Sequence, residues 1–576
     1  MINKKIAEIF DEIANMLSIE ETPSSKFEVR AYKEAALAIG SMQEDLEDIY
    51  KRGGVPALME IPGVGKGLAG KIEELIKKGK IAKYEELKKK YPIDFKTLTQ
   101  IEGLGPKKIA MLYKQLGVKD LETLKRAINK HTIRELPSFG ERSEEKLKEG
   151  VGFLESSKGR LRLGDALPEA ESIIERLKKS GLVEEAIIAG SARRMKETVG
   201  DLDILAISKR EKEVMDFFVG MKEVEQALVK GPTKTTVRLN IGITCDLRVI
   251  EPKSFGAAVQ YFTGSKDHNI KVRTIAIKKG YKLNEYGLFD RHGKLITSRS
   301  EDVIYGKLGM QIMPPEMRED RGEVELALQH KIPKLIELAD LKGDLHTHTK
   351  EAGGANSMDE MARAAIAMGL DYIALTNHTK SLKISNGLND KSFLKIFEGI
   401  EKLNERLDGK FTMLKGAEVD ILKNGSLDLE KKTLERMDCA VGAVHSNFNM
   451  SKQEMTRRVI NAMDSGLLRV LAHPTGRVIN EREPYQIDLE RVIEAAERNN
   501  IALEINSFPE RLDLSDTNIM LASKYKVMFA IDSDGHNISH FKFLRYGIGT
   551  ARRGWLQKDR VINAMGLEKL TAWLER

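Results

Sequence analysis

The chain has 576 residues, of which 41% are hydrophobic and 31% are charged, and its formal net charge is +7. This length predicts roughly three to five compact units, and the composition excludes a largely disordered chain. No apolar run approaches the roughly 18 residues that a membrane-spanning helix needs, so we expect no membrane association. The two cysteines, Cys245 and Cys439, lack metal-ligand spacing and indicate a reducing, cytoplasmic setting.

The first 150 residues have helical periodicity interrupted by short glycine turns, and the pattern loosens at 151–165, as in a linker or hinge. Residues 51–130 hold 19 Lys and Arg against 9 Asp and Glu, whereas residues 1–50 hold 5 against 11. A basic block of this size is either a solvated surface or a phosphate-binding face. The glycine motifs inside the block favour the phosphate-binding face.

Two segments of the basic block share one plan, a helix, a Gly-x-Gly turn and a second helix: LMEIPGVGKGLAGKIEEL (58–75) and LTQIEGLGPKKIAMLYKQLGV (98–118). The glycines allow close approach of a ligand, and the N–H groups at the start of the next helix suit a phosphate oxygen. One such segment alone could be an ordinary helical corner, but two copies with matching lysines favour sequence-independent binding of the DNA backbone. The predicted DNA contacts are Gly63, Gly65, Lys66, Gly103, Gly105, Lys107 and Lys108.

Strand-like runs begin near residue 184, where the class changes to mixed α/β. In AGSARRMKETVGDLDILAIS (189–208), Asp201 and Asp203 are two apart on an expected strand, so their carboxylates share a face. Such carboxylates repel each other unless a divalent cation lies between them, although Asp-x-Asp can also be a solvated strand edge. Asp246 in TCDLRVI adds a third carboxylate, and the preceding Gly190-Ser191 offers amides and a hydroxyl to a triphosphate. The pattern indicates a nucleotidyl-transfer centre.

The order G-S-x-R-R-x(5)-G-D-L-D, then D-L-R, then YFTGS (261–265), resembles the palm and thumb of family X DNA polymerases, and the two hairpins match that family over residues 1–320. The resemblance implies gap filling in base-excision repair, with dNTPs and gapped or nicked double-stranded DNA as substrates. It implies that Asp201, Asp203 and Asp246 are catalytic and bind Mg²⁺ or Mn²⁺. The implied nucleotide contacts are Gly190, Ser191, Arg194, Gly200, Tyr261, Phe262, Gly264, Asn269 and Arg273.

The N-terminal part resembles the small domain of the same family that grips the 5′ side of a gap. Tyr32, Lys66 and Lys71 fall near positions that handle the 5′-phosphate there. Lys71 aligns with the Schiff-base lysine that removes a deoxyribose-phosphate remnant, which implies a lyase activity. The alternative is a surface lysine without catalytic function, because a nucleophilic lysine needs a lowered pKa.

Seven of the 11 histidines follow residue 340, and six of these lie directly after or within apolar runs. The alternation of strand-like runs and helices predicts a parallel barrel, whose strand ends would bring these side chains to one mouth. One histidine alone is more often structural, but six at strand ends favour a site for Zn²⁺ or Mn²⁺ that could cleave a phosphodiester. The predicted ligands are His346, His348, His378, Glu418, His445, His473, Asp534 and His536.

Residues 341–576 resemble the PHP (polymerase and histidinol phosphatase) family, which implies a 3′–5′ exonuclease or 3′-end-processing activity. Two positions depart from the family pattern. Asn377 and Gly353 stand where the family usually has aspartates, and neither an amide nor a glycine supplies a charged ligand. One alternative is therefore a polymerase whose PHP domain is a structural or docking module. Another, a small-molecule phosphatase that merely binds DNA, is disfavoured by the three palm carboxylates.

These inferences together predict a multidomain chain and a monomer, of the bacterial or archaeal type of the family. The fold class is helical N-terminal domains with helix-hairpin-helix motifs, an α/β nucleotidyltransferase palm and thumb, and a C-terminal (β/α) barrel-like PHP domain. The expected domains are a 5′-phosphate-binding, lyase-like domain (1–90), a fingers-like domain (91–150), the palm (151–255), a thumb-like nucleotide-selection domain (256–318), a linker (319–340) and the PHP domain (341–576).

Overall fold

The computed structural model describes residues 2–575 except 21, 41–45, 62, 99–100, 102–103, 138, 142, 146, 149–150, 152–159, 383–384, 386, 481 and 483. The expected hinge at 151–165 therefore lies largely outside the described residues. The chain forms two compact units, Met1–Gly159 and Arg160–Arg576, each with its own core. None of the described helices is long and apolar enough to cross a membrane.

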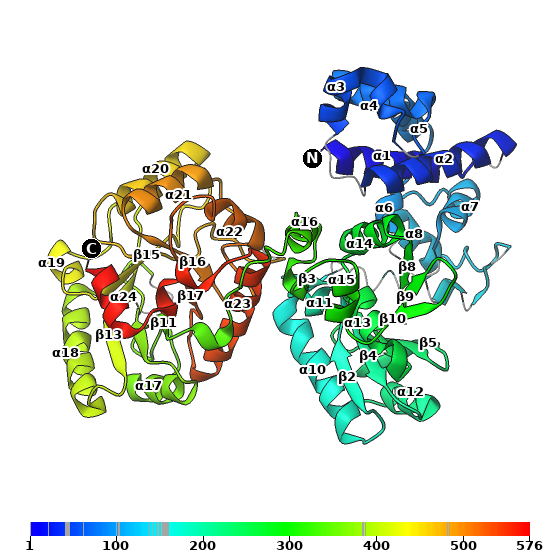
Figure 1. Ribbon diagram of the computed structural model, residues 1–576. Helices are drawn as coiled ribbons and strands as arrows, with labels where there is room; N and C mark the ends of the chain where they lie inside the picture. The colour runs from blue at the N-terminus through cyan, green and yellow to red at the C-terminus, as the bar shows by residue number, and fades with distance from the viewer. Residues whose placement is uncertain are drawn as a thin grey trace. The chain divides into compact units, whose positions relative to one another are not determined.

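The first unit is helical (blue to cyan in Figure 1) and has one core of buried aliphatic side chains, among them Ile13, Ile72 and Leu112. Local signals fix its helix ends. Asp120 accepts a hydrogen bond from the Thr123 N–H and starts a helix, and Gly79 ends another in the left-handed conformation with φ of 69°. The helices are α1 (Ile2–Leu17), α2 (Pro23–Gly40), α3 (Leu46–Leu58), α4 (Lys66–Lys78), α5 (Ala82–Lys90), α6 (Phe95–Leu98), α7 (Pro106–Leu116) and α8 (Leu121–Asn129).

The second unit begins with a five-stranded sheet in the order β2-β4-β7-β6-β5. Its two central strands, β4 and β7, run parallel, and the remaining pairs are antiparallel. The sheet strands are β2 (Glu185–Ile188), β4 (Asp201–Ile207), β5 (Val224–Lys230), β6 (Lys234–Leu239) and β7 (Thr244–Val249). Helices α10 (Leu163–Lys179), α11 (Gly190–Arg193) and α12 (Glu211–Val219) accompany it, and β1 (Leu161–Arg162) pairs with β3 (Thr198–Val199).

A smaller layer follows, in which helices pack on a three-stranded antiparallel sheet. Its elements are α13 (Phe255–Thr263), α14 (Lys266–Lys278), β8 (Tyr281–Asn284), β9 (Gly287–Asp290), β10 (Leu295–Thr297) and α15 (Glu301–Lys307). Within the connector expected at 319–340, the α-helix is α16 (Glu323–Leu328), and a 3₁₀ turn covers Leu338–Asp340. Arg318 and Glu323 are fully buried, so the start of this connector is part of the packed structure.

The C-terminal region is a seven-stranded parallel sheet whose strands follow one another in chain order from β11 to β17. Hydrogen bonds between His346, His348 and Gly535 link the first strand to the loop after the last, which nearly closes the sheet into a barrel. The strands are β11 (Gly343–Thr347), β12 (Tyr372–Leu375), β13 (Thr412–Asp420), β14 (Cys439–Ala443), β15 (Val470–Leu471), β16 (Ala502–Asn506) and β17 (Phe529–Asp532).

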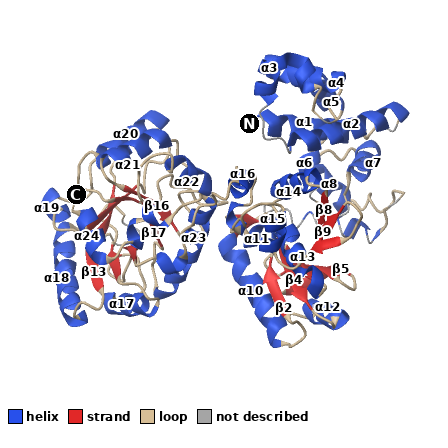
Figure 2. Ribbon diagram, viewed as in Figure 1, coloured by secondary structure: helices blue, strands red, loops and turns tan. Residues whose placement is uncertain are grey.

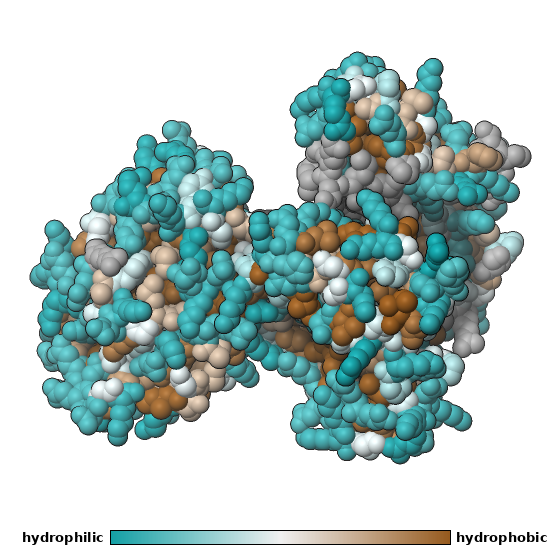
Figure 3. Space-filling view, viewed as in Figure 1, coloured by the Kyte–Doolittle hydropathy of each residue, from teal (hydrophilic) through white to brown (hydrophobic). Residues whose placement is uncertain are grey.

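Helices surround these strands, which lie at the centre of the region in Figure 2. Alternation along each strand separates two sets of buried side chains: Ile373 packs toward the outer helices, while Ala374 belongs to an inner cluster that includes Trp573. The side of the helices facing solvent is mainly hydrophilic (Figure 3). The helices are α17 (Met358–Ala367), α18 (Asp390–Leu407), α19 (Lys431–Leu434), α20 (Lys452–Met463), α21 (Leu489–Arg498), α22 (Asp516–Ala522), α23 (Leu544–Arg553) and α24 (Leu567–Leu574).

Candidate active sites

The three predicted carboxylates of the first sheet lie together. Strands β4 and β7 are parallel, and their register sets Asp203 directly opposite Asp246. Asp201 precedes Asp203 by two residues on the same strand and therefore projects from the same face. The structure thus unites acidic groups that are more than forty residues apart in sequence.

The electrostatics of this carboxylate cluster fit a divalent cation. Burial, followed by the charges of Asp201 and Asp246, raises the pKa of Asp203 to about 7. Asp246 is held in place because its Oδ1 accepts a hydrogen bond from Thr236 Oγ1 at 2.6 Å and its Oδ2 lies 2.9 Å from Lys234 Nζ. Three carboxylates that repel one another are a donor set suited to a hard ion such as Mg²⁺ or Mn²⁺.

The chain just before the carboxylates packs directly against Asp203. Gly190 has φ of 61°, and a Cβ there would lie 2.4 Å from Asp203 Oδ2, so glycine is required on both counts. The next side chain, Ser191, has a buried Oγ without a hydrogen-bond partner among the described residues. Gly200 lies between β3 and β4, directly before Asp201. An oxygen-rich anion such as a triphosphate would satisfy the Ser191 hydroxyl.

The remaining predicted nucleotide contacts border the same region. Arg194 is 8% exposed, and its Nη1 donates a hydrogen bond to the carbonyl of Thr263, directly before Gly264. Asn269 Nδ2 donates to the Tyr261 carbonyl at 2.7 Å, and Arg273 Nε donates to the Asn269 carbonyl at 3.2 Å. The Phe262 ring packs edge-on against Tyr261 and lies under the Arg248 guanidinium at 4.5 Å.

The last glycine of each turn in the helical unit, Gly65 and Gly105, faces open space. Gly65 precedes α4 and Gly105 precedes α7, both with negative φ that any residue can adopt, and a Cβ on either would meet no atom of the described residues within 4 Å. The fold therefore does not require glycine at these two positions. Close approach of a ligand such as the DNA backbone would require it, because a side chain would fill the space. Gly63 has φ of 83°, and Gly103 lies outside the described residues.

The lysines beside the turns differ in exposure. Lys66 and Lys107 are exposed, and Lys108 is half-buried with its Nζ 5.4 Å above the Phe139 ring. Lys71 Nζ lies 5.7 Å above the Tyr32 ring and donates to the Gly67 carbonyl. Tyr32 itself is only 2% exposed, so its ring belongs to the core and supports Lys71 rather than reaching solvent.

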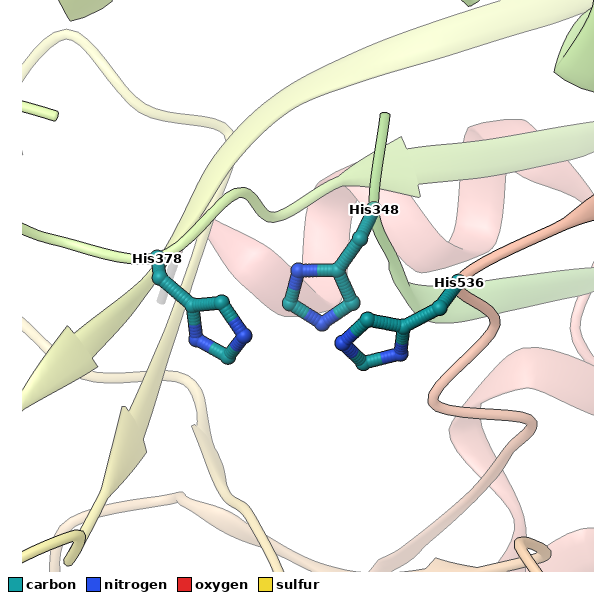
Figure 4. A group of neighbouring side chains, drawn as sticks. All are labelled: His348, His378 and His536. Atoms are coloured by element: carbon teal, nitrogen blue, oxygen red, sulfur yellow. The ribbon is translucent and has the colours of Figure 1, made fainter. Parts of the chain in front are cut away.

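The predicted ligands of the second centre converge at the carboxyl ends of the parallel strands. Rings from three different loops, His348, His378 and His536, point toward one space (Figure 4), and those of His378 and His536 lie 4.3 and 4.2 Å from His348. The donor atoms form three overlapping groups within metal-binding distance of one another. These groups are His348, His378 and His536; His346, His348 and Asp534; and His378, Glu418 and His445.

Glu418 links these groups. Its carboxylate lies 2.5 Å from His378 Nδ1, 3.0 Å from His473 Nε2 and 3.1 Å from His445 Nε2. Burial alone would raise the pKa of Glu418, but the imidazoles of His445 and His378 outweigh it and hold that pKa well below its usual range. A fully buried carboxylate that stays ionised needs cations around it, either protonated imidazoles or metal ions.

The orientation of the imidazoles also fits a metal centre. His346 Nδ1 lies 2.6 Å from Glu504 Oε1, which fixes the ring with Nε2 toward the centre. The Nδ1 of His348 is buried without a hydrogen-bond partner among the described residues. Imidazole nitrogens and carboxylate oxygens in overlapping sets suit two or three ions of Zn²⁺ or Mn²⁺ type.

The two departures from the PHP pattern have local consequences. Asn377 Oδ1 accepts from the Thr349 N–H at 2.8 Å and its Nδ2 donates to Thr349 Oγ1 at 2.9 Å, so the amide is used within the protein. A Cβ at Gly353 would lie 3.2 Å from His378 Cδ2, which places backbone beside the histidine group. Neither Asn377 nor Gly353 belongs to the three groups of donor atoms, so those groups do not depend on an aspartate at either position.

Glu504 and Asp420 are two contributors that sequence analysis missed. Glu504 on β16 orients His346 and also accepts from the His473 N–H at 2.6 Å, and Asp420 Oδ1 lies 3.7 Å from His445 Nδ1. Both are buried. The sequence did contain a signal for Glu504, which stands inside the apolar strand run IALEIN. A carboxylate buried in such a strand needs a polar or charged partner.

Comparisons with known proteins agree with this arrangement. The chain matches the family models for a helix-hairpin-helix domain over residues 1–81, a SAM-like helix-hairpin-helix tandem over 95–151, a DNA polymerase beta thumb over 258–319 and a PHP domain over 344–508. These matches follow the expected order of helical, thumb and PHP parts.

One relative spans the whole chain. A DNA polymerase/3′-5′ exonuclease PolX of Bacillus subtilis (strain 168) is 36% identical over 579 residues, which covers 100% of both chains. A probable phosphatase of Caldanaerobacter subterraneus subsp. tengcongensis is 29% identical over 34% of this chain and 75% of its own length. Another, from Acetivibrio thermocellus, is 31% identical over 28% and 64%. The chain therefore belongs to the family X DNA polymerases that carry a C-terminal PHP domain.

Proposed function

We propose that the chain is a DNA polymerase that fills gaps in double-stranded DNA during base-excision repair and processes 3′ ends through its PHP domain. The observation that carries the proposal is the register of β4 and β7, which sets Asp203 beside Asp246 with Asp201 on the same face. The full-length relative, named for both polymerase and 3′–5′ exonuclease activity, supports the pairing of these activities. We further infer a cytoplasmic monomer.

In the proposed polymerase reaction, Asp201, Asp203 and Asp246 would hold Mg²⁺ or Mn²⁺, which neutralises the triphosphate and favours deprotonation of the primer hydroxyl. The primer O3′ forms a bond to the α-phosphorus, the α–β phosphoanhydride bond breaks, and pyrophosphate leaves. The Ser191 hydroxyl, which has no partner among the described residues, would donate to a phosphate oxygen, and Gly190 leaves the room that the Asp203 carboxylate needs. Holding the reactants in line supplies much of the acceleration.

Contacts to the rest of the nucleotide follow from the layer after the palm. Arg194 would neutralise the triphosphate, and Gly200 would present its backbone to it. Tyr261, Phe262 and Gly264 would line the sugar, with Asn269 and Arg273 on the minor-groove side of the new base pair. The hydrogen bonds between Asn269 and the Tyr261 carbonyl, and between Arg273 and the Asn269 carbonyl, support one shared surface.

In the proposed nuclease reaction, the PHP ligands would hold Zn²⁺ or Mn²⁺, which polarises the scissile phosphodiester and activates water. Glu504 keeps His346 in the tautomer that presents Nε2, and Glu418 balances the imidazoles around it. Three intact donor groups favour an active nuclease over a purely structural PHP module. Asn377 and Gly353, where the family usually has aspartates, remain the features that motivate that alternative.

The helical unit would hold the DNA around the gap. The open space at Gly65 and Gly105 and the exposed Lys66 and Lys107 favour backbone phosphates as ligands. Lys71 would form a Schiff base with a 5′-deoxyribose-phosphate remnant, with loss of water, and so release the remnant by elimination.

A one-nucleotide-gap extension assay, with and without a 5′-phosphate on the downstream strand, tests the proposed function. We expect Asp203→Asn to abolish incorporation, because the cluster loses a metal-binding charge, and we expect the 5′-phosphate to increase extension by the unaltered chain. Asp216→Asn is the matched control, since Asp216 lies on α12 of the same domain and pairs with Lys230 at the surface. Incorporation by Asp203→Asn at the rate of the control would refute the assignment.

A further inference from the structure

An arginine of the PHP domain contacts the palm segment proposed to bind the triphosphate. Arg553, the last residue of α23, is 4% exposed. Its Nη1 donates to the Arg194 carbonyl at 2.9 Å and to Glu319 Oε1 at 2.9 Å, and its Nη2 donates to Asp516 Oδ2 at 2.8 Å. A planar guanidinium suits three acceptors in fixed directions, which an ammonium group cannot match.

Glu319 is shared between two arginines. Its Oε1 accepts from Arg553 and also from Arg194 Nε at 3.0 Å. Burial alone would raise the pKa of Glu319, but the cations of Arg194 and Arg553 outweigh it and lower that pKa, so the carboxylate is charged. Glu319 therefore interacts with both guanidiniums, and the charge of Lys196 makes a smaller contribution.

A second contact on the same helix approaches the next palm residue. A Cβ at Gly549, one turn before Arg553, would lie 2.9 Å from the Met195 Cβ and 2.6 Å from its Cε. Met195 has φ of 53°, an uncommon conformation for a residue other than glycine. Helix α23 thus contacts two consecutive palm residues, the main-chain carbonyl of Arg194 and the side chain of Met195.

We infer that Arg553 is a positioning residue of the polymerase reaction, so that the PHP domain sets the affinity of the palm for the incoming dNTP through Arg194. This inference rests on the proposed role of Arg194 as a triphosphate ligand. Without Arg553, the Arg194 carbonyl loses its donor, and Arg194 becomes the cation that interacts most strongly with Glu319. Both effects weaken binding of a triphosphate. Arg194 is no longer fixed in position, and Glu319 competes more strongly with the triphosphate for the Arg194 guanidinium.

The test is steady-state single-nucleotide gap filling by the full-length chain. We expect Arg553→Met to raise the KM for dNTP by about tenfold and to change kcat by less than about twofold. This is the pattern for a lost contact that lowers the affinity for dNTP without altering the chemical step. Arg553→Lys should be intermediate, because it restores the charge without the three directed hydrogen bonds. Adding Glu319→Gln to Arg553→Met should recover part of the lost affinity, since the competing charge is gone, and a merely structural effect predicts no such recovery.

Arg545→Met is the matched control. Arg545 lies on the same helix and pairs with Glu171 of α10 at 3.0 Å, so it joins the same two regions without contacting a nucleotide residue. The KM for dNTP should be unchanged in this variant, and PHP nuclease activity should persist in both variants. If Arg553→Met does not fold, the KM for dNTP of Arg553→Lys and of the single variant Glu319→Gln is compared with that of Arg545→Met instead.

Three outcomes separate the inference from the proposed function. A normal KM in Arg553→Met, with a raised KM in Arg194→Met, would overturn the positioning role and leave the proposed function standing. A normal KM in Arg194→Met would overturn its role as a triphosphate ligand. Equal effects of Arg553→Met and Arg545→Met would show that general docking of the PHP domain, rather than Arg553, controls affinity, which also overturns the inference.

Discussion

Two carboxylates, the half-buried Asp203 and the buried Glu418, have opposite pKa shifts. Burial and then the charges of two aspartates raise the pKa of Asp203 to about 7, whereas imidazoles outweigh burial at Glu418 and hold its pKa well below its usual range. The acidic cluster therefore needs cations to ionise fully, while the histidine centre already contains groups that can carry positive charge. The two candidate centres therefore differ in the charges that surround a bound cation.

A third carboxylate, Glu301, is predicted to contribute to stability in a pH-dependent way. It lies between Arg193 and Arg318, whose charges outweigh its burial and lower its pKa from 4.5 to about 2. A lowered pKa stabilises the folded state above pH 4.5 and loses that contribution as the pH falls toward 2. Glu301→Gln should therefore lower the free energy of unfolding at pH 7 by about 3 kcal/mol, with a shrinking difference below pH 4.5.

Urea unfolding at pH 7, 4.5 and 3 measures the effect of Glu301→Gln. The exposed Glu251, which pairs with Lys253, provides the control variant Glu251→Gln, for which we expect little change at any pH. The same stability difference at pH 3 as at pH 7 would count against an ionised Glu301 in the folded state.

Among the elements, the buried strands of the parallel sheet were predictable, whereas β5 and β8 to β10 were not. The apolar runs YIALT, CAVGAVH, IALEIN and VMFAID coincide with β12, β14, β16 and β17, because parallel strands covered on both faces are continuously hydrophobic. In contrast, β5 alternates between half-buried and exposed residues, and β8 to β10 are short antiparallel strands with polar residues. Neither pattern stands out from a loop in sequence.

The convergence of the site could be predicted from the same rule, but its pairings could not. Parallel strands bring their carboxyl ends to one edge, which was enough to expect His346, His378 and Asp534 together. The contact between His346 and Glu504 joins residues 158 apart and depends on strand register. Likewise, the hydrogen bonds that use up the Asn377 amide depend on the exact position of Thr349, which no motif specifies.

The first residue of α11 provides a prediction at the scale of an element. Gly190→Ala would place a Cβ 2.4 Å from Asp203 Oδ2 and strain a backbone with φ of 61°. We expect nucleotide incorporation to fall by about a hundredfold, because Asp203 must move by a large fraction of an ångström or more. Gap extension measures this loss. In Gly220→Ala, where φ is negative and the added Cβ makes ordinary contacts at 3.5 Å, activity should persist, and a comparable loss there would argue against the steric cause.

For residues 160–576 as a whole, two candidate centres stand on separate sheets of one compact unit. The acidic cluster belongs to a mixed sheet, and the histidine centre belongs to the parallel barrel. Ion pairs such as Arg477 with Glu197 and Arg552 with Glu316 join the two regions. Because the two centres lie on separate sheets, we expect that nucleotide incorporation and 3′-end cleavage can be removed separately. The shared interface still allows the PHP domain to influence dNTP binding in the palm.

The most direct test of this account compares Asp203→Asn and Glu418→Gln in one Mn²⁺ buffer, measuring nucleotide incorporation at a gap and release of nucleotides from a 3′ end. We expect Asp203→Asn to lose incorporation and keep 3′ release, and Glu418→Gln to lose 3′ release and keep incorporation. Loss of both activities in either variant, or retention of the activity assigned to the altered residue, would contradict two separate metal centres.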